Sequence, residues 1–149
     1  MSFHRFTGIP LLGLLLFATV QAQSASETLA DLQWKHRIIL VNASGPSQAE
    51  TAVETLRSAR GEVEDRDILW FVVTDNSLAS NRPDPGKAME RSVRETLTSR
   101  SGGQSVILIG KDGGVKDRSE SLDLERIFSV IDRMPMRVRE MRQKQEEGG

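Results

Sequence analysis

Three apolar runs of strand length constrain the fold of this chain more than any other feature. They lie in residues 37–42, 67–74 and 105–110 and are rich in Ile, Leu and Val. A strand with one face in water alternates apolar and polar residues, whereas continuous runs such as these suit strands that are covered on both faces. We therefore expect an α/β fold in which helices lie on both sides of a sheet.

The segment between the first two runs has helical periodicity. Ser47 to Glu50 reads as a capping box, in which the Ser and Glu side chains satisfy backbone N–H groups at the start of a helix. The residues that would form its buried face are Ala49, Ala52, Val53, Leu56 and Ala59. Gly61 is expected to end this helix. Strand, helix and strand of these lengths predict a right-handed parallel unit.

A second helix is expected before the third run. Asp84 and Pro85 read as an N-cap followed by proline at the first helical position, and Gly102-Gly103 ends the helix. The residues of its inward stripe are Met89, Val93 and Leu97. Residues 75–84, in front of this helix, are polar and are expected to form a connection.

The last third of the chain predicts a hairpin and more helix. Asp112-Gly113 in the turn of residues 111–114 meets the demand for positive φ, and residues 115–118 would be the returning edge strand. An amphipathic helix is marked by Leu124, Ile127, Phe128 and Ile131. Pro135 must break or restart it, and residues 136–145 can form a short additional helix.

This order of elements predicts one thioredoxin-like domain over residues 23–145. Its fold class is α/β, with a mixed four-stranded sheet flanked by helices. Residues 28–33 are expected to add one helical turn that directs Leu29 and Leu32 inward, and residues 146–149 are expected to form a disordered tail. The length of 149 residues leaves room for a single domain.

Residues 1–22 have the pattern of a removable signal peptide. Arg5 supplies the cationic start, residues 6–20 are mostly apolar, and Val20-Gln21-Ala22 offers small residues for cleavage after Ala22. The apolar run is shorter than the roughly 20 residues that a spanning helix needs, so a retained anchor is the less favoured alternative. We therefore expect a periplasmic or secreted protein without membrane insertion after cleavage.

Composition excludes several functions. The chain has no Cys, which rules out disulfides, thiol redox catalysis and thiolate metal sites. It has only two His, His4 within the predicted signal and His36, so one mature chain cannot build a multi-histidine metal site. A formal net charge of −1 gives no general attraction to nucleic acid or anionic lipid.

Four stretches carry a family resemblance. They are residues 33–37 (QWKHR), 65–67 (DRD), 108–116 (LIGKDGGVK) and 131–137 (IDRMPMR). With them the chain resembles the family catalogued as domain of unknown function 4174 over about the whole mature length. The resemblance implies a peroxiredoxin-like, thioredoxin-type fold and an extracytoplasmic setting, since related domains occur in secreted and matrix-associated animal proteins. It brings no settled activity.

The resemblance does not extend to thiol chemistry. The reactive thiol of peroxiredoxins and thioredoxins follows the first central strand, where this chain reads Ala43-Ser44-Gly45-Pro46-Ser47. A serine hydrolase would need His36 as its base, but His36 precedes that strand and Ser44 follows it, about 20 Å away. Peroxidase and thiol oxidoreductase activities are therefore excluded, and the serine hydrolase is nearly so.

Two further groups of residues have simple alternatives. Asp65 and Asp67 could act as a general acid and a general base. The simpler interpretation is a solvent-exposed loop in which these carboxylates pair with Arg66. Met134, Met136 and Met141 could bind copper(I), although adaptable core packing is favoured.

In a thioredoxin-like sheet, the four signature stretches gather at one pole. The starts of strands one and two, the turn after strand three and the end of the amphipathic helix all lie there, whereas Ser44, Asp75 and Gln104 lie at the other pole. We expect a charged cluster at the first pole, about 20 Å or more from Ser44. The candidate ligand-binding residues are Trp34, Arg37, Arg66, Lys111, Asp112, Lys116, Asp132 and Arg137.

Two interpretations of this pole remain open at the level of sequence. The charged residues can pair with one another as a structural clasp, or they can bind an unknown protein or a small anionic ligand. The sequence indicates no catalytic residue, metal ligand set or cofactor, and no nucleic-acid partner. The favoured function is a non-catalytic binding module; the alternative is an enzyme of unknown reaction with an acquired metal or cofactor.

Overall fold

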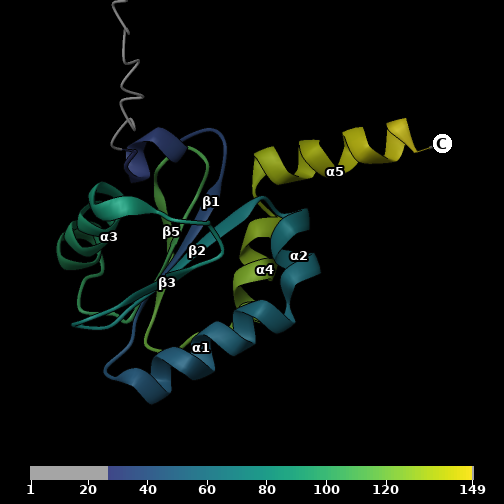
Figure 1. Ribbon diagram of the computed structural model, residues 1–149. Helices are drawn as coiled ribbons and strands as arrows, with labels where there is room; N and C mark the ends of the chain where they lie inside the picture. The colour runs from purple at the N-terminus through teal and green to yellow at the C-terminus, as the bar shows by residue number, and fades with distance from the viewer. Residues whose placement is uncertain (1–26, 149) are drawn as a thin grey trace, which may run out of the picture.

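The computed structural model describes residues 27–148 (Figure 1). The predicted signal peptide, residues 1–22, lies outside the described residues. In chain order, the elements are η1 (Leu29–Leu32), β1 (Arg37–Asn42), α1 (Pro46–Ser58), α2 (Arg60–Asp65), β2 (Ile68–Val73), β3 (Leu78–Ser80), α3 (Gly86–Arg100), β4 (Val106–Ile109), β5 (Val115–Ser119), α4 (Leu124–Asp132) and α5 (Pro135–Glu147). No helix of the described part of the chain is long and apolar enough to cross a membrane.

The sheet is mixed and has five strands in the order β3-β2-β1-β4-β5. β1 and β2 are parallel, with Arg37 opposite Ile68, and β4 runs antiparallel to β1, as predicted. The turn at Gly113 closes the predicted hairpin of β4 and β5. The expectation of four strands is wrong, because β3 forms within the polar connection and pairs antiparallel with β2.

Helices cover both faces of the sheet (Figure 1). Alternate residues of β1 point to opposite faces: Ile39 and Val41 join the core under α1, α2 and α4, whereas Ile38 and Leu40 join the core under η1 and α3. All but the last residue of β1 are buried, so the interpretation of the continuous runs as doubly covered strands is confirmed. Arg37 has the parity of Ile39 and therefore emerges on the α4 side.

The first helical segment differs from the prediction in two ways. α1 begins at Pro46 with Gly45 as its N-cap and has no side-chain cap, so the capping box at Ser47 is absent. Gln48 instead accepts hydrogen bonds from the N–H and hydroxyl of Ser44. Gly61 does not end the helix, because the chain turns at Ala59 and continues as α2.

The second helix also starts later than predicted. Pro85 is the N-cap of α3, not its first residue, and Asp84 adopts a left-handed conformation with a φ of 44°. The inward stripe is as predicted, since Met89, Val93 and Leu97 are all buried. Gly102 and Gly103 follow the helix at positive φ, as a helix stop requires.

α5 is the least buried helix. It starts at Pro135, where the proline predicts a break after the preceding helix. It continues to Glu147 and so includes residues 146 and 147, which the sequence assigned to the disordered tail. Arg137 is its only buried residue, and its end extends away from the rest of the described chain (Figure 1). A helix this polar is held in place by specific side-chain contacts and not by an apolar face.

Candidate functional site

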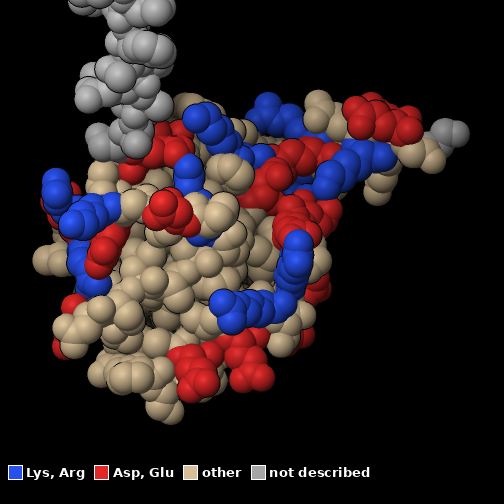
Figure 2. Space-filling model, viewed as in Figure 1, with Lys and Arg blue, Asp and Glu red and all other residues tan. Residues whose placement is uncertain are grey.

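Charged side chains gather where α5 meets the sheet (Figure 2). The ends that meet there are the start of β1, the start of β2, the β4–β5 turn and the α4–α5 junction. The residues that interact are Arg37, Asp65, Arg66, Asp67, Lys111, Asp132, Arg137 and Glu140. We call this set the polar clasp. Ser44 follows the other end of β1, a strand about 20 Å long, so the predicted clustering at the opposite pole is confirmed.

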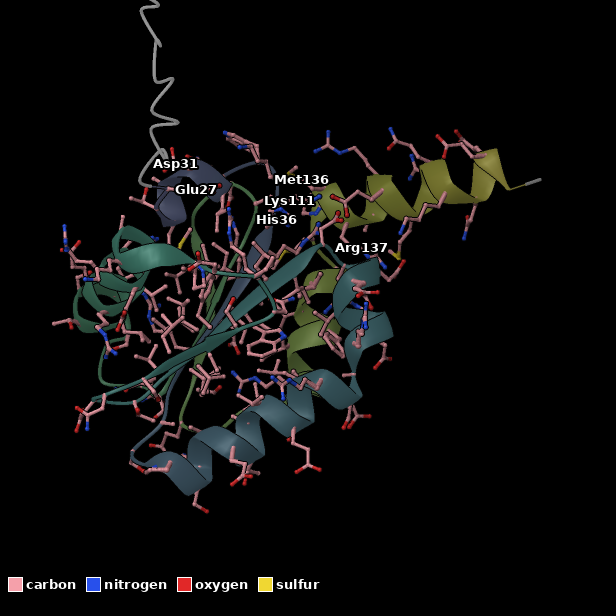
Figure 3. The ribbon with its side chains drawn as sticks, viewed as in Figure 1. Glu27, Asp31, His36, Lys111, Met136 and Arg137 are labelled. Carbon is pink, nitrogen blue, oxygen red and sulfur yellow. The ribbon has the colours of Figure 1, made fainter. Side chains whose placement is uncertain are left out.

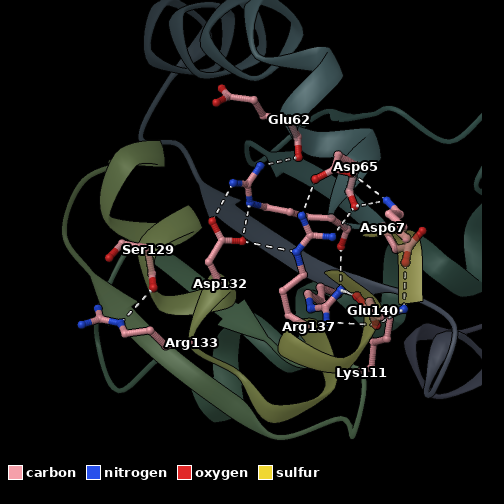
Figure 4. A network of polar contacts seen from close by, with 12 residues as sticks. Glu62, Asp65, Asp67, Lys111, Ser129, Asp132, Arg133, Arg137 and Glu140 are labelled. Carbon is pink, nitrogen blue, oxygen red and sulfur yellow. Dashed lines mark hydrogen bonds and ion pairs between the residues drawn. The ribbon is translucent and has the colours of Figure 1, made fainter. Parts of the chain in front are cut away.

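Asp132, at the end of α4, accepts hydrogen bonds from two arginines (Figure 4). Its carboxylate pairs with Arg66 through both oxygens, at 3.0 and 2.7 Å, and with Arg137 Nε at 3.3 Å. Arg66 also lies over the Phe128 ring, 4.6 Å from its centroid. Arg137 reaches further to the carboxylate and the carbonyl of Asp65. These contacts join α2, α4 and α5.

Arg37 and Lys111 hold Glu140 of α5. The Arg37 side chain is only 1% exposed and lies 3.1 Å from the Glu140 carboxylate, while it also donates to the carbonyl of Arg66. Lys111 Nζ lies 2.8 Å from both Glu140 and Asp67. Among the described residues, the Nε–H of Arg37 has no hydrogen-bond acceptor. One buried donor in the clasp is therefore unsatisfied.

Three carboxylates of the clasp have lowered pKa values. A hydrogen bond from Lys144, together with those from Arg137, lowers the pKa of Asp65. Partial burial by itself would raise the pKa of Asp132, but its contacts with Arg66 and Arg137 outweigh burial and lower it. The pKa of Glu140 is lowered in the same way by Lys111 and Arg37 against the effect of burial. The network is thus most favourable when these groups are charged.

A cavity of about 470 Å³ lies beside the clasp. One side is formed by Arg37 and by the β4–β5 hairpin, through Gly110, Lys111, Asp112 and Lys116. The other side is formed by the α4–α5 junction, through Val130, Arg133, Met134, Pro135 and Met136. Figure 3 places Lys111 and Met136 at the start of α5, where the two sides meet. The cavity therefore combines cationic groups with an apolar wall.

The structure places the predicted site residues in three different settings. Those that line the cavity are Arg37, Lys111, Asp112 and Lys116. Arg66, Asp132 and Arg137 belong to the clasp but do not line the cavity, and each is paired with a partner of opposite charge. Trp34 lies outside the cavity: its side chain is 62% exposed, and its N–H donates to the Lys111 carbonyl at 2.6 Å. Trp34 thus supports the turn through its backbone.

The apolar half of the cavity was not predicted as a site. Met134 and Met136 were interpreted as core packing and Arg133 was not among the candidate residues, yet all three line the cavity. The signal that could have found them is the sequence Arg133-Met134-Pro135-Met136 itself. Proline is favoured at the first position of a helix, so Pro135 marks these residues as the junction between two helices.

A family model described as domain of unknown function 4174 matches residues 28–140. The chain belongs to this family. The matched segment of the 4174 domain runs from η1 to Glu140, the residue that pairs with Arg37, and so includes both the clasp and the cavity. Lys144, which pairs with Asp65, lies beyond the match. No curated protein matches the chain.

Within the described residues, the 4174 domain does not assemble the serine hydrolase or a metal site of His and carboxylate ligands. His36 and Ser44 flank opposite ends of β1, and Ser44 bonds to Gln48. Within residues 27–148, no three His, Asp or Glu side chains are grouped as a metal site requires. Asp65 pairs with Arg137 and Lys144, and Asp67 pairs with Lys111. The expectation that this loop pairs with its own Arg66 is wrong, because Arg66 pairs with Asp132 of α4.

Proposed function

We propose that this protein is a periplasmic or secreted, non-catalytic binding module with a thioredoxin-like fold. The core strand order β2-β1-β4-β5, with only the β1–β2 pair parallel, supports the thioredoxin-like assignment. The signal-peptide pattern of residues 1–22 supports export. The binding site is the cavity beside the polar clasp, and the clasp fixes its walls.

The observation that carries this proposal is the difference between the clasp and the cavity. Arg66 and Arg137 are engaged with carboxylates and serve the structure, whereas the adjacent cavity has the size and the mixed polar and apolar lining of a small-molecule site. The cavity is also lined by Arg133, which has no carboxylate partner among the described residues. A binding site needs such an available group, and a purely structural network does not.

A thermal-shift screen tests this function. The purified protein is heated with representatives of several ligand classes: carboxylates, phosphates, sulfates and acidic peptides. We expect at least one class to raise the melting temperature, because a ligand that binds only the folded state stabilises it. We expect no class to be converted to product over many turnovers.

The double variant Lys116→Ala, Arg133→Ala locates the effect. The ligand class that stabilises the natural protein should no longer stabilise this variant. Arg139 is an exposed arginine of α5 outside the cavity, so Arg139→Ala should respond like the natural protein. If no class stabilises the protein, or if the double variant responds unchanged, the cavity is not a binding site. Turnover of any class would favour the enzyme alternative.

A further inference from the structure

The cavity beside the clasp has one positive charge in excess. The four cations that line it are Arg37, Lys111, Lys116 and Arg133. Three carboxylates pair with them: Glu140 with Arg37 and Lys111, Asp67 with Lys111, and Asp112 with Lys116 at 2.6 Å. Arg133 is the cation without a carboxylate partner in the described part of the chain. A ligand carrying one negative charge would therefore neutralise the site.

Arg133 is placed to meet such a ligand. It donates through Nε to the carbonyl of Ser129, one turn earlier in α4, at 3.0 Å. This bond leaves the two terminal nitrogens of the guanidinium available, and Figure 4 shows the side chain directed away from the clasp. A guanidinium presents its N–H groups in a planar fork that matches a carboxylate.

Arg37 also lines the cavity and is almost fully buried. Its Nε–H has no acceptor among the described residues, but this atom is enclosed by the protein and is not accessible to a ligand. Arg133 is therefore the group that favours a ligand with acceptor oxygens and a single charge.

The rest of the α4–α5 side of the cavity is apolar. It consists of Val130, Met134, Pro135 and Met136, and the two methionines are flexible enough to adapt to a chain of variable shape. Burying a hydrocarbon tail against this wall is favourable by about 0.8 kcal/mol for each CH₂ removed from water. The cavity volume of about 470 Å³ leaves room for such a tail.

From these features we infer that the cavity binds an amphipathic monocarboxylate, an organic anion with one carboxylate and an apolar tail. Arg133 binds the carboxylate at the entrance and the methionine wall covers the tail. A phosphate monoester fits less well, because it carries about −1.5 to −2 charges at pH 7 and the site has one positive charge in excess. This inference rests on the proposed function and specifies its ligand class.

The test is an NMR titration of ¹⁵N-labelled protein with four probes: octanoate, acetate, octanol and octyl phosphate. Octanoate should bind at one saturable site and shift the amide signals of Gly110 and Gly114. Acetate lacks the tail and octanol lacks the charge, so each should bind at least about tenfold more weakly. Octyl phosphate should also bind more weakly than octanoate.

Arg133→Ala should weaken octanoate binding at least about tenfold, since the charge-assisted hydrogen bonds are lost. Arg139→Ala should leave it unchanged. Both arginines are exposed and neither belongs to the clasp, so both variants should keep the fold, which circular dichroism checks.

The inference is overturned if octanoate does not bind, if acetate or octanol binds as tightly, or if Arg133→Ala binds octanoate unchanged. If octyl phosphate or another class from the thermal-shift screen binds better and depends on Arg133, the monocarboxylate inference fails while the binding-module proposal stands. If no probe and no screened class binds, both fail.

Discussion

The guanidinium of Arg37 lies 3.1 Å from the carboxylate of Glu140, and this contact joins the first strand of the sheet to the last helix. The two residues are far apart in sequence, and the exposed fractions of their side chains are 1% and 21%. Since Arg137 is the only buried residue of α5, polar contacts of this kind decide where the helix lies. The contacts of the clasp therefore hold α5 in position, as apolar packing holds the other helices.

Removing the charge of Glu140 should destabilise the protein. Glu140→Gln leaves Arg37 buried without its counter-ion, a situation that costs more than the ion pair contributes. We expect a loss of about 2 kcal/mol or more in the free energy of unfolding. Denaturant unfolding measures it.

The matched control is Lys144→Ala, because Lys144 pairs with Asp65 while its own side chain is 57% exposed. Exposed pairs of this kind contribute about 0 to 1 kcal/mol. Equal losses in the two variants would contradict the role assigned to burial in the clasp.

Arg137→Ala should release α5 while leaving the sheet intact. Arg137 binds Asp65 and Asp132 from a side chain that is 4% exposed, so its loss removes the contacts of α5 with α2 and α4 together. Hydrogen exchange should show that the amides of residues 138–145 lose protection while those of β1 and β4 keep theirs. Arg139→Ala should retain protection throughout. Unchanged protection of α5 in Arg137→Ala would show that other contacts hold the helix.

Stability should decrease in acid through the clasp. The pKa values of Asp65, Asp132 and Glu140 are lowered in the folded protein from ordinary values of 3.8, 3.8 and 4.5. The unfolded chain therefore binds more protons in this range, and the stability that these groups contribute is full above their ordinary values and is lost as pH falls through the folded ones. Urea unfolding between about pH 6 and about pH 3 measures the decrease.

Asp132→Asn identifies the source of this pH dependence. The variant removes one of the titrating groups, so its stability should fall less steeply over the same range. Glu146→Gln, which changes an exposed carboxylate of α5 outside the clasp, should keep the steepness of the natural protein. If the stability of Asp132→Asn falls as steeply as that of the natural protein, Asp132 is not a source of the pH dependence.

The sequence predicted the parts of the fold that rest on long apolar patterns. Burial on both faces predicted the strands β1, β2 and β4. Turn chemistry predicted the hairpin, and helical periodicity predicted the inward stripe of α3. β3 could not be predicted in this way. It is three residues long, its residues are half-buried, and only β2 pairs with it within the described sheet. Its formation depends on the neighbouring strand and not on its own pattern.

For a similar reason, the sequence predicted the charged part of the candidate site but not its apolar part. Charged residues at the ends of elements indicate a pole once the topology is assumed, and Arg37, Lys111, Asp112 and Lys116 were found in this way. Apolar residues at a helix junction have the same composition as a core, so the wall of Met134 and Met136 could not be distinguished from packing. Only the three-dimensional gap between α4 and the hairpin distinguishes the two.

Two glycine-to-alanine variants should act in opposite directions because their surroundings differ. Gly61 lies in α2, and an added Cβ meets nothing within 4 Å, so Gly61→Ala should raise the free energy of unfolding by about 0.5 to 1 kcal/mol through helix propensity. Gly110 faces the cavity, and an added Cβ would lie 2.6 Å from Lys116 Cε and 2.9 Å from Asp112 Oδ1. Gly110→Ala should displace the Lys116 side chain and weaken octanoate binding, at a cost of up to about 1 kcal/mol, because both contacted atoms end flexible and partly exposed side chains. Denaturant unfolding and the NMR titration measure the two effects on the same samples. The added methyl group and the displaced Lys116 would both obstruct a ligand bound against the hairpin side of the cavity. If Gly110→Ala binds octanoate as tightly as the natural protein, the ligand therefore does not contact this side.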